Sequence, residues 1–397
     1  MISVGIDVSK GKSTICILKP GGEVLQPPFE INHTADGLES LVALIKSFDE
    51  EVRVVLEDTG HYHLPVVIPL VESGIFVCCV NALRMKKFCS QSLRRAKTDK
   101  IDSIKIANFG LTYWSELTPT LPKGEVYQEL KLLARQYYQT VSLLIKAKVN
   151  LSNLLDQSMP NIQTVLADNK SNCKLTDFVA RYYHCSHILE MGEQGFTIDY
   201  CAWAKEKGYR LNERKAAQIL AIAQNGIPTL PNSVSTQIAV SEAVKLIQSI
   251  TESRNTILAQ IQEFCKSLPE YFIVKDMPCI GDTLAPRIIA EIGDVRRFKN
   301  KRSLVAYAGI DAPPYQSGTF NASERHISKR GNSYLRKTAF EIMQSLIQHK
   351  PNGDPVYDFI QKKRSEGKSA KEAMVAGINK FLRVYYGMVM ELYSNAV

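Results

Sequence analysis

Four acidic residues stand where their carboxylates could act together: Asp7, Glu57, Asp99 and Asp102. Asp7 lies in the middle of an apolar segment, and an acid inside an apolar strand is costly to bury unless it is paired or binds a metal. Glu57 ends the apolar run Val-Val-Leu-Glu, and ligands of α/β sheets gather at the carboxyl ends of strands. Asp99 and Asp102 share one helical face if Thr98 caps a helix.

Converging from two strands and a helix, the four carboxylates would make a site for hard divalent cations. Two Mg²⁺ ions about 4 Å apart can hold the attacking and leaving oxygens of a phosphodiester. Singly, each acid is more often structural, and Asp99 and Asp102 with their lysine neighbours also fit a solvated helix face. Asp7 within a strand and Glu57 at a strand end favour the joint site. The sugar kinase and actin ATPase fold also opens with such an aspartate, but its second glycine-rich phosphate loop is not evident in this sequence.

A serine in a glycine- and proline-rich loop is the second candidate for chemistry. Ser317 lies in the segment 309–318 between two basic stretches, and a serine hydroxyl can attack phosphorus when its proton is removed and cations stabilise the charge. Lys329, Arg330 and Arg336 follow, and they could clamp a phosphate or only track a nucleic-acid backbone. Gln-Ser-Gly is also common in plain turns, so both interpretations stay open.

The elements that must position the acids follow a recognisable order. Short β-prone segments joined by tight turns at 3–9, 13–18 and 23–26 predict an antiparallel meander. A helix ending near residue 48, a strand at 52–57, a helix at 61–73 and a strand at 75–80 predict parallel strands with a crossover. Three antiparallel strands followed by parallel strands and helices are typical of the ribonuclease H-like fold.

The rest of the chain is predicted to be mostly helical. Apolar spacings of three and four predict long helices near 126–155 and 240–268, as a helical hairpin or a dimer stalk. The segment 160–235 has no clear pattern. Residues 277–282 and the helix after them resemble a helix-hairpin-helix, which offers backbone N–H groups to a phosphate. We predict three domains, at 1–115, 116–270 and 271–397.

Composition excludes several classes of protein. The 397 residues are 45% hydrophobic and 22% charged, which is ordinary for a globular protein of two or three domains. No run reaches the roughly 18 apolar residues of a membrane helix, and the N-terminus does not resemble a signal peptide. Nine cysteines without a Cys-x-x-Cys pair argue against a disulfide framework or zinc ribbon and fit a reducing cytoplasm.

Positive charge is concentrated in two windows. Residues 84–105 hold eight Lys or Arg and two acids, a balance of +6. Residues 296–337 hold ten Lys or Arg and two acids, a balance of +8, while the whole chain carries only +9. Such clustering indicates nucleic-acid binding, with Arg94, Arg95 and Lys97 as contacts in the first window. Two basic surfaces that contact only solvent would give the same concentration of charge.

The motifs together resemble the DEDD-type insertion-sequence transposases related to the Piv invertase. The resemblance lies in the segments Gly-Ile-Asp-Val-Ser-Lys at 5–10, Leu-Glu-Asp-Thr-Gly at 56–60, Lys-Thr-Asp-Lys-Ile-Asp at 97–102, Cys-Ile-Gly at 279–281, Ala-Glu-Ile-Gly-Asp at 290–294, Tyr-Ala-Gly-Ile at 307–310, Gln-Ser-Gly at 316–318 and Ile-Ser-Lys-Arg-Gly-Asn at 327–332. They cover about 1–155 and 270–345 in the family's order.

This resemblance implies a RuvC-like ribonuclease H domain, a coiled-coil linker and a C-terminal transposase domain. By the same resemblance Asp7, Glu57, Asp99 and Asp102 bind Mg²⁺, and Ser317 attacks DNA to form a phosphoserine link. It also implies a dimer or tetramer that recombines donor and target DNA chosen by an element-encoded guide RNA.

Two other functions remain open. A RuvC-like nuclease would use the four acids and metal-activated water without a covalent intermediate. A nucleic-acid scaffold would use only the basic windows. Dependence on divalent metal separates the scaffold from the two enzymes, and loss of activity in Ser317→Ala separates the recombinase from the nuclease.

Overall fold

The computed structural model describes residues 1–58, 60–90, 98–120, 124–168, 173–313, 316–317, 320–321 and 326–395. These residues form two compact units, Met1–Lys123 and Gly124–Val397, which are described one at a time. The three-domain division at 115 and 270 stays a prediction.

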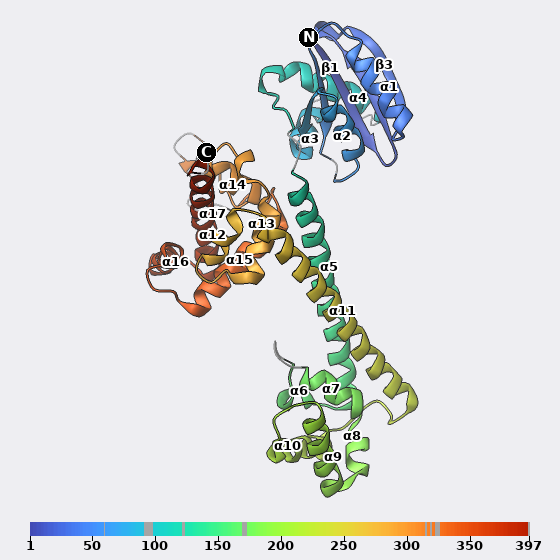
Figure 1. The fold of residues 1–397 in the computed structure, drawn as a ribbon, viewed down its shortest axis with the longest axis vertical. Coiled ribbons are helices and arrows are strands. Elements are labelled where there is room, and N and C mark those ends of the chain that lie inside the picture. The colour runs from blue at the N-terminus through green and yellow to red at the C-terminus, as the bar shows by residue number, and fades with distance from the viewer. Residues whose placement is uncertain are drawn as a thin grey trace. The chain divides into compact units, whose positions relative to one another are not determined.

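The first unit is built on a mixed five-stranded sheet (Figure 1). Its strands are β1 (Ile2–Ser9), β2 (Lys12–Leu18), β3 (Val24–Asn32), β4 (Val52–Glu57) and β5 (Phe76–Val80), in the spatial order β3-β2-β1-β4-β5. The pairs β1–β2 and β2–β3 are antiparallel, and β1–β4 and β4–β5 are parallel. The predicted ribonuclease H-like order is therefore confirmed. The third strand is longer than predicted, because Pro27 and Pro28 are tolerated in an edge strand.

Helices cover both faces of this sheet. They are α1 (Ala35–Lys46), α2 (Leu64–Glu72), α3 (Ala82–Cys89) and α4 (Asp99–Thr112). Buried side chains of α1 and α2 share one apolar core with Ile6 and Leu56, whereas α3 and α4 contribute to another core with Val55. The helix α3 was not predicted, because its short sequence contains three cations and buries only Met85.

The helix α4 packs directly on the backbone of β1 because two glycines leave room for it. A Cβ atom at Gly5 would collide with the backbone nitrogen of Ala107 and the backbone oxygen of Ser103. A Cβ atom at Gly110 would likewise collide with the side chain of Ser3. The close approach of helix and strand is therefore fixed by these two positions.

We expect Gly5→Ala to destabilise the first unit by about 1–3 kcal/mol, because the clash is with backbone that cannot rotate away. Urea unfolding followed by circular dichroism measures the change. Gly387→Ala is the matched control, since a Cβ atom there meets nothing within 4 Å and helical alanine is favoured over glycine. Equal stability of Gly5→Ala and the wild type would contradict this account of the packing.

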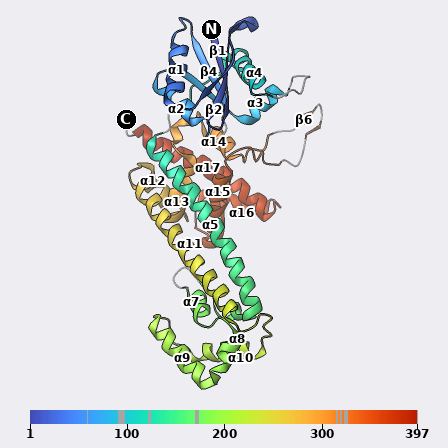
Figure 2. The same cartoon turned by 90° about the vertical axis from the view of Figure 1, so that its right-hand side faces the viewer.

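The second unit contains a long helical hairpin. The helices α5 (Glu125–Ser158) and α11 (Val234–Lys266) pack side by side along much of their length (Figures 1 and 2). Five shorter helices connect them: α6 (Ile162–Val165), α7 (Lys174–Arg181), α8 (Cys185–Glu190), α9 (Gly192–Glu206) and α10 (Glu213–Asn225). An aromatic core that includes Phe178, Tyr200 and Trp203 holds this connecting segment together. The long helices form one hairpin within the chain.

The remaining elements of the second unit surround a separate core. They are α12 (Glu270–Asp276), α13 (Gly281–Ile292), α14 (Lys301–Ala308), β6 (Gln316–Ser317), β7 (Phe320–Asn321), α15 (Ser333–His349), α16 (Pro355–Ser365) and α17 (Ala370–Asn395). The two ends of the hairpin belong to the same core, because Leu130 of α5 and Ile261 of α11 are buried within it. The helix predicted after residue 282 is α13, and α12 precedes the turn that leads to it.

Two chain-wide features complete the fold. All nine cysteines lie among the described residues and carry free thiols. Within the part of the chain that the structure describes, no helix has the length and hydrophobicity needed to cross a bilayer.

Candidate functional site

Asp7 and Glu57 lie at the same level on two neighbouring parallel strands. Ile6 of β1 is paired with Leu56 of β4, and both are buried on the sheet face that α1 and α2 cover. Because side chains alternate along a strand, the next residues, Asp7 and Glu57, face the opposite side, where α4 packs. The two carboxylates therefore share one face at the carboxyl ends of their strands.

The first turn of α4 is brought to the same end of the sheet. Gly110 approaches Ser3, and residues 103–107 approach Gly5, so α4 runs antiparallel to β1. Its beginning therefore lies toward the strand end that carries Asp7. Thr98 caps the helix as predicted, since its Oγ1 accepts a hydrogen bond from the Ile101 amide at 3.2 Å.

The thiol of Cys89, at the end of α3, lies close to several of the predicted metal ligands. Burial raises the pKa of its thiol, the ammonium of Lys105 opposes that shift, and the charges of Asp102, Glu57 and Asp7 raise the pKa further. All four charged groups therefore lie near enough to this thiol to act on its pKa. Lys105 Nζ lies 3.9 Å from Asp102 Oδ1, at a distance where it offsets part of the carboxylate charge.

The donor set suits a hard divalent cation, because carboxylate oxygens are its preferred ligands. Asp7, Glu57 and Asp102 are half-buried in this neighbourhood, and Asp99 is exposed at the start of α4. Within the described residues, no three His, Cys, Asp or Glu side chains form a group that could hold a metal ion. The four-carboxylate site stays a prediction, supported by the shared sheet edge of Asp7 and Glu57 and by the position of the first turn of α4.

The loop that carries Ser317 is closed at its base. Ser317 lies in the short strand β6, paired in antiparallel fashion with Phe320 of β7. At the base, the Lys329 amide donates to the Gly309 carbonyl at 2.9 Å, and the Asn332 amide donates to the Tyr307 carbonyl at 2.7 Å. A Cβ atom at Gly331 would collide with the Tyr307 carbonyl and the Gly309 amide, so only glycine permits this closure.

The three predicted phosphate contacts of this loop have different surroundings. Arg336 Nη1 donates to the carbonyls of Ala308 at 2.9 Å and Gly331 at 3.0 Å, and it therefore holds the loop base together. Lys329 and Arg330 are exposed beside the base, and Lys329 has a left-handed backbone conformation with φ of 53°. Their binding of phosphate stays a prediction.

A buried carboxylate, which the sequence did not single out, anchors the far side of this base. Glu291 Oε2 accepts hydrogen bonds from Asn332 Nδ2 at 2.7 Å and from Arg135 Nη2 at 3.0 Å. Asn332 Oδ1 also caps α15 by accepting from the Tyr334 and Leu335 amides. One asparagine thus links the loop end, the start of α15 and the buried acid of α13. Glu291 and Asn332 both lie in segments that carry the family resemblance, at 290–294 and 327–332, and this was the available signal.

The buried carboxyl group of Glu291 should make the unfolding free energy depend on pH. Burial raises the pKa of its carboxyl above the usual value of 4.5, with Asn332, Arg135, Lys131 and Arg287 opposing the shift. The protonated form therefore stabilises the fold below pH 4.5, and this contribution disappears as the pH rises through the raised pKa.

We expect the unfolding free energy of the wild type relative to Glu291→Gln to fall between pH 4 and neutrality, by at most about 1.4 kcal/mol per pH unit. Urea unfolding at several pH values measures it. A difference that is flat or increases with pH would contradict the assignment.

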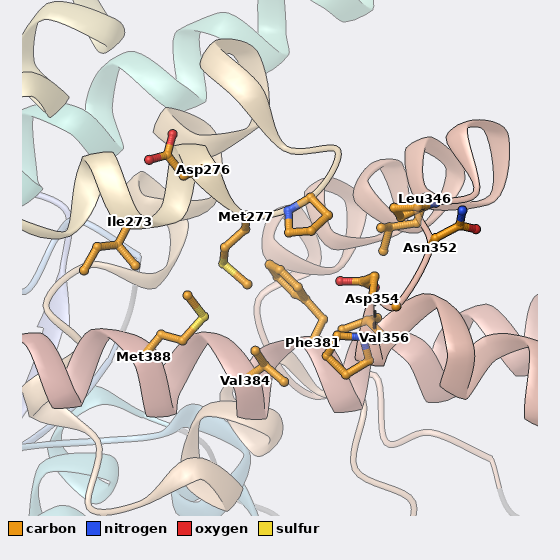
Figure 3. A pocket seen from close by; sticks show the side chains of 14 residues that line it. Ile273, Asp276, Met277, Leu346, Asn352, Asp354, Val356, Phe381, Val384 and Met388 are labelled. Atoms are coloured by element: carbon orange, nitrogen blue, oxygen red, sulfur yellow. Dashed lines mark hydrogen bonds between the residues drawn. The ribbon is translucent and has the colours of Figure 1, made fainter.

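The turn between α12 and α13 contributes to an apolar pocket of about 470 Å³ (Figure 3). Met277, Phe381 and Met388 line the pocket, and the carboxylate of Asp354 lies at its edge. At the start of α13, Asp282 accepts hydrogen bonds from Tyr271 and Lys275, which lowers its pKa. Asp282 lies in the first turn of α13, where the helix-hairpin-helix prediction places a phosphate, and phosphate binding there stays a prediction.

Arg94, Arg95 and Lys97 lie outside the described residues. Their contact with nucleic acid stays a prediction that rests on the charge of their window.

The sheet order and the helix packed across β1 are those of the ribonuclease H-like fold. Two family profiles match the chain: a DEDD transposase profile of the IS110 type at residues 4–160, and a profile described as "Transposase IS116/IS110/IS902 family" at residues 272–358. The chain therefore belongs to the IS110-type insertion-sequence transposases, a family of transposases and recombinases.

Several proteins show the same relationship. The insertion element IS110 43.6 kDa protein of Streptomyces coelicolor is 22% identical, over 81% of this chain and 77% of its own length. The IS116 44.8 kDa protein of Streptomyces clavuligerus is 22% identical, over 98% and 95%. The pilin gene-inverting protein of Moraxella bovis is 25% identical, over 30% and 36%.

Solved structures of RuvC are also similar. Thermus thermophilus RuvC in complex with a Holliday junction substrate is 11% identical, with a TM-score of 0.24, over 30% of this chain and 99% of RuvC.

Proposed function

We propose that this protein cuts and rejoins DNA strands in transposition, with the carboxylates of the first unit and Ser317 of the second as its chemical groups. The observation that carries the proposal is the placement of Asp7 and Glu57 on one face at the carboxyl ends of the paired strands β1 and β4, with the first turn of α4 at the same end of the sheet. Membership of the IS110-type family supports the reaction class. The pilin gene-inverting relatives suggest site-specific rearrangement of DNA as the outcome.

Mg²⁺ is the proposed cofactor, held by Asp7, Glu57, Asp99 and Asp102. When bound, it would neutralise charge on the reacting phosphate and favour the deprotonated form of a nearby hydroxyl group. The chain's own contribution is to keep three of these carboxylates at one sheet edge, through the aligned ends of β1 and β4 and the close seating of α4. Lys105, beside Asp102, limits the repulsion among them.

Ser317 is the proposed nucleophile. Its Oγ forms a bond to phosphorus while the bond from phosphorus to one DNA oxygen breaks, and the serine proton passes to the leaving oxygen by way of solvent or a nearby base. In the second step a DNA hydroxyl attacks the phosphoserine, which restores the serine and joins the new strand. The number of phosphodiester bonds is conserved, so no energy source is needed. The closed base of the loop supports this role, because it holds the ends of the segment that carries Ser317.

The partners follow from the family and the charge. DNA, both donor and target, is the substrate, and a guide RNA that selects both is proposed from the resemblance. A homodimer or tetramer is proposed as the active form. Arg94, Arg95, Lys97, Lys329 and Arg330 are proposed contacts to the nucleic-acid backbone.

The experiment that tests the proposal is capture of the covalent intermediate. The full chain is incubated with labelled donor and target DNA, the RNA of its element and Mg²⁺, and the products are separated under denaturing conditions. A labelled band at the mass of protein plus DNA is expected, and it should be absent with a chelator. Cut strands without any adduct would favour the nuclease that uses activated water, and absence of both products would contradict the proposal.

A further inference from the structure

The last helix of the chain forms one wall of a basic pocket. Helices α14 and α16 both pack against α17, and a pocket of about 630 Å³ lies among them. Its lining side chains are Lys301 of α14, Phe359 of α16, and Ala376, Asn379, Lys380, Arg383 and Val384 of α17. The residues from α17 are spaced by three and four, so they present one face of that helix.

The charged side chains that line this pocket are all positive. Lys301, Lys380 and Arg383 line it, and no acid does. Among the described residues, none of these three cations forms an ion pair, whereas many other lysines and arginines of the chain do. Three cations around one hollow with no carboxylate partner raise the local potential, and a bound anion would lower it.

Two neutral side chains shape the pocket further. Asn379 Oδ1 accepts a hydrogen bond from Arg383 Nε at 2.7 Å, which orients the guanidinium. Phe359 is half-buried and places an aromatic ring in the lining. Proteins that bind single-stranded nucleic acid without sequence preference combine positive side chains along the phosphate backbone with aromatic side chains on which bases stack.

The apolar pocket in Figure 3 makes a useful contrast. It also touches α17 and shares Val384, but Asp276 and Asp354 line it, and no lysine or arginine does. The two pockets therefore differ in sign of charge although they lie against the same helix. Only the basic one suits a phosphate.

We propose that this basic pocket binds the sugar–phosphate backbone of a nucleic-acid strand, with phosphates at Lys301, Lys380 and Arg383 and a base or sugar against Phe359. The inference rests on the proposed function, because it names a further surface by which the same protein holds its DNA or RNA. Lys301 belongs to the basic window at 296–337, but Lys380 and Arg383 do not. Residues 370–395 hold three Lys or Arg and two acids, so net charge along the sequence does not reveal this face.

The test is the salt dependence of binding by the full chain. Fluorescence anisotropy is measured between about 50 and 200 mM salt with single-stranded DNA, RNA of the same sequence and duplex DNA. The pocket variant is Lys301→Gln, Lys380→Gln, Arg383→Gln. The matched control is Lys205→Gln, Lys207→Gln, Arg210→Gln, which removes the same charges from exposed positions of the segment between the long helices.

Log K falls as log salt rises, and each lost phosphate contact should make this negative slope shallower by about 0.7 on a single strand and about 0.9 on a duplex. The pocket variant should therefore lose about 2 units of slope on a single strand and about 2.7 on a duplex, and each lost contact should weaken single-strand binding roughly fivefold at 0.1 M salt. The exchange Lys301→Arg, Lys380→Arg, Arg383→Lys should keep the slope, which separates lost charge from a damaged fold. Weakening with RNA alone or with DNA alone would identify which strand occupies the pocket.

Equal binding by the pocket and control variants, with all three probes, would overturn this inference and leave the proposed function standing. A wild-type chain that binds none of the probes would overturn both.

Discussion

Ser317→Ala should bind DNA as the wild type does and form no covalent adduct. The serine hydroxyl is the only group in the proposal that becomes bonded to phosphorus, so its removal leaves no alternative route to the phosphoserine. Loss of a serine nucleophile lowers turnover by about 10⁶-fold in well-studied hydrolases, and we expect the joined product to fall below detection. Denaturing gels measure the adduct, and anisotropy measures the binding.

Ser365→Ala is the matched control for this variant. Ser365 ends α16, and its hydroxyl donates only to the Lys362 carbonyl of its own helix. The control should retain both adduct and product. An adduct that persists in Ser317→Ala, or one that peptide sequencing assigns to another residue, would exclude Ser317 as the nucleophile.

Asp7→Asn should abolish strand cutting and leave the fold intact. Asparagine keeps the shape of the side chain but removes a charge from the carboxylate group, so affinity for a divalent cation falls. Because like charges repel in the absence of metal, the unfolding free energy of the metal-free variant should be unchanged or up to about 1 kcal/mol higher.

A readout that does not depend on catalysis accompanies this variant. Mg²⁺ should raise the melting temperature of the wild type, because a ligand that binds only the folded state stabilises it, and it should leave Asp7→Asn unchanged. Asp36→Asn is the control, since Asp36 is exposed in the first turn of α1 on the other side of the sheet. If Mg²⁺ raised the melting temperature of the wild type and of Asp7→Asn equally, Asp7 would be excluded as a ligand.

The first unit was predictable because its signals are local. Alternation in β1 and β2, the apolar strand that ends at Glu57 and the cap at Thr98 each specify a short segment, and the handedness of strand crossovers then restricts their order. Segment 160–235 was not predictable, because its helices are short and are held by aromatic contacts between residues distant in sequence, such as Phe178 with Trp203. A short helix carries too few residues to show a period.

The residues of the candidate site also divide into those that could be predicted from local sequence and those that could not. Asp7 and Glu57 could be placed at one sheet edge because parallel strands in register bring equivalent positions together. The role of Glu291 was missed, since its partners Arg135 and Asn332 are 156 and 41 residues away. The pocket on α17 was missed for a similar reason, because its cations become neighbours only when α14 packs against the last helix.

The burial of both hairpin ends in one core determines when this protein can fold. Leu130 and Ala134 pack in the same core as Leu382 and Tyr385, so contacts that complete the core join residues about 250 positions apart. Contacts of such separation form slowly, because a long loop must first be closed. During synthesis, the sheet unit can therefore acquire its structure while translation continues, whereas the core that joins the hairpin ends to the last helix must wait until α17 has left the ribosome. Until then the part of α5 around Leu130 and Ala134 lacks its partners, and this apolar stretch of the nascent chain is one that a chaperone would protect.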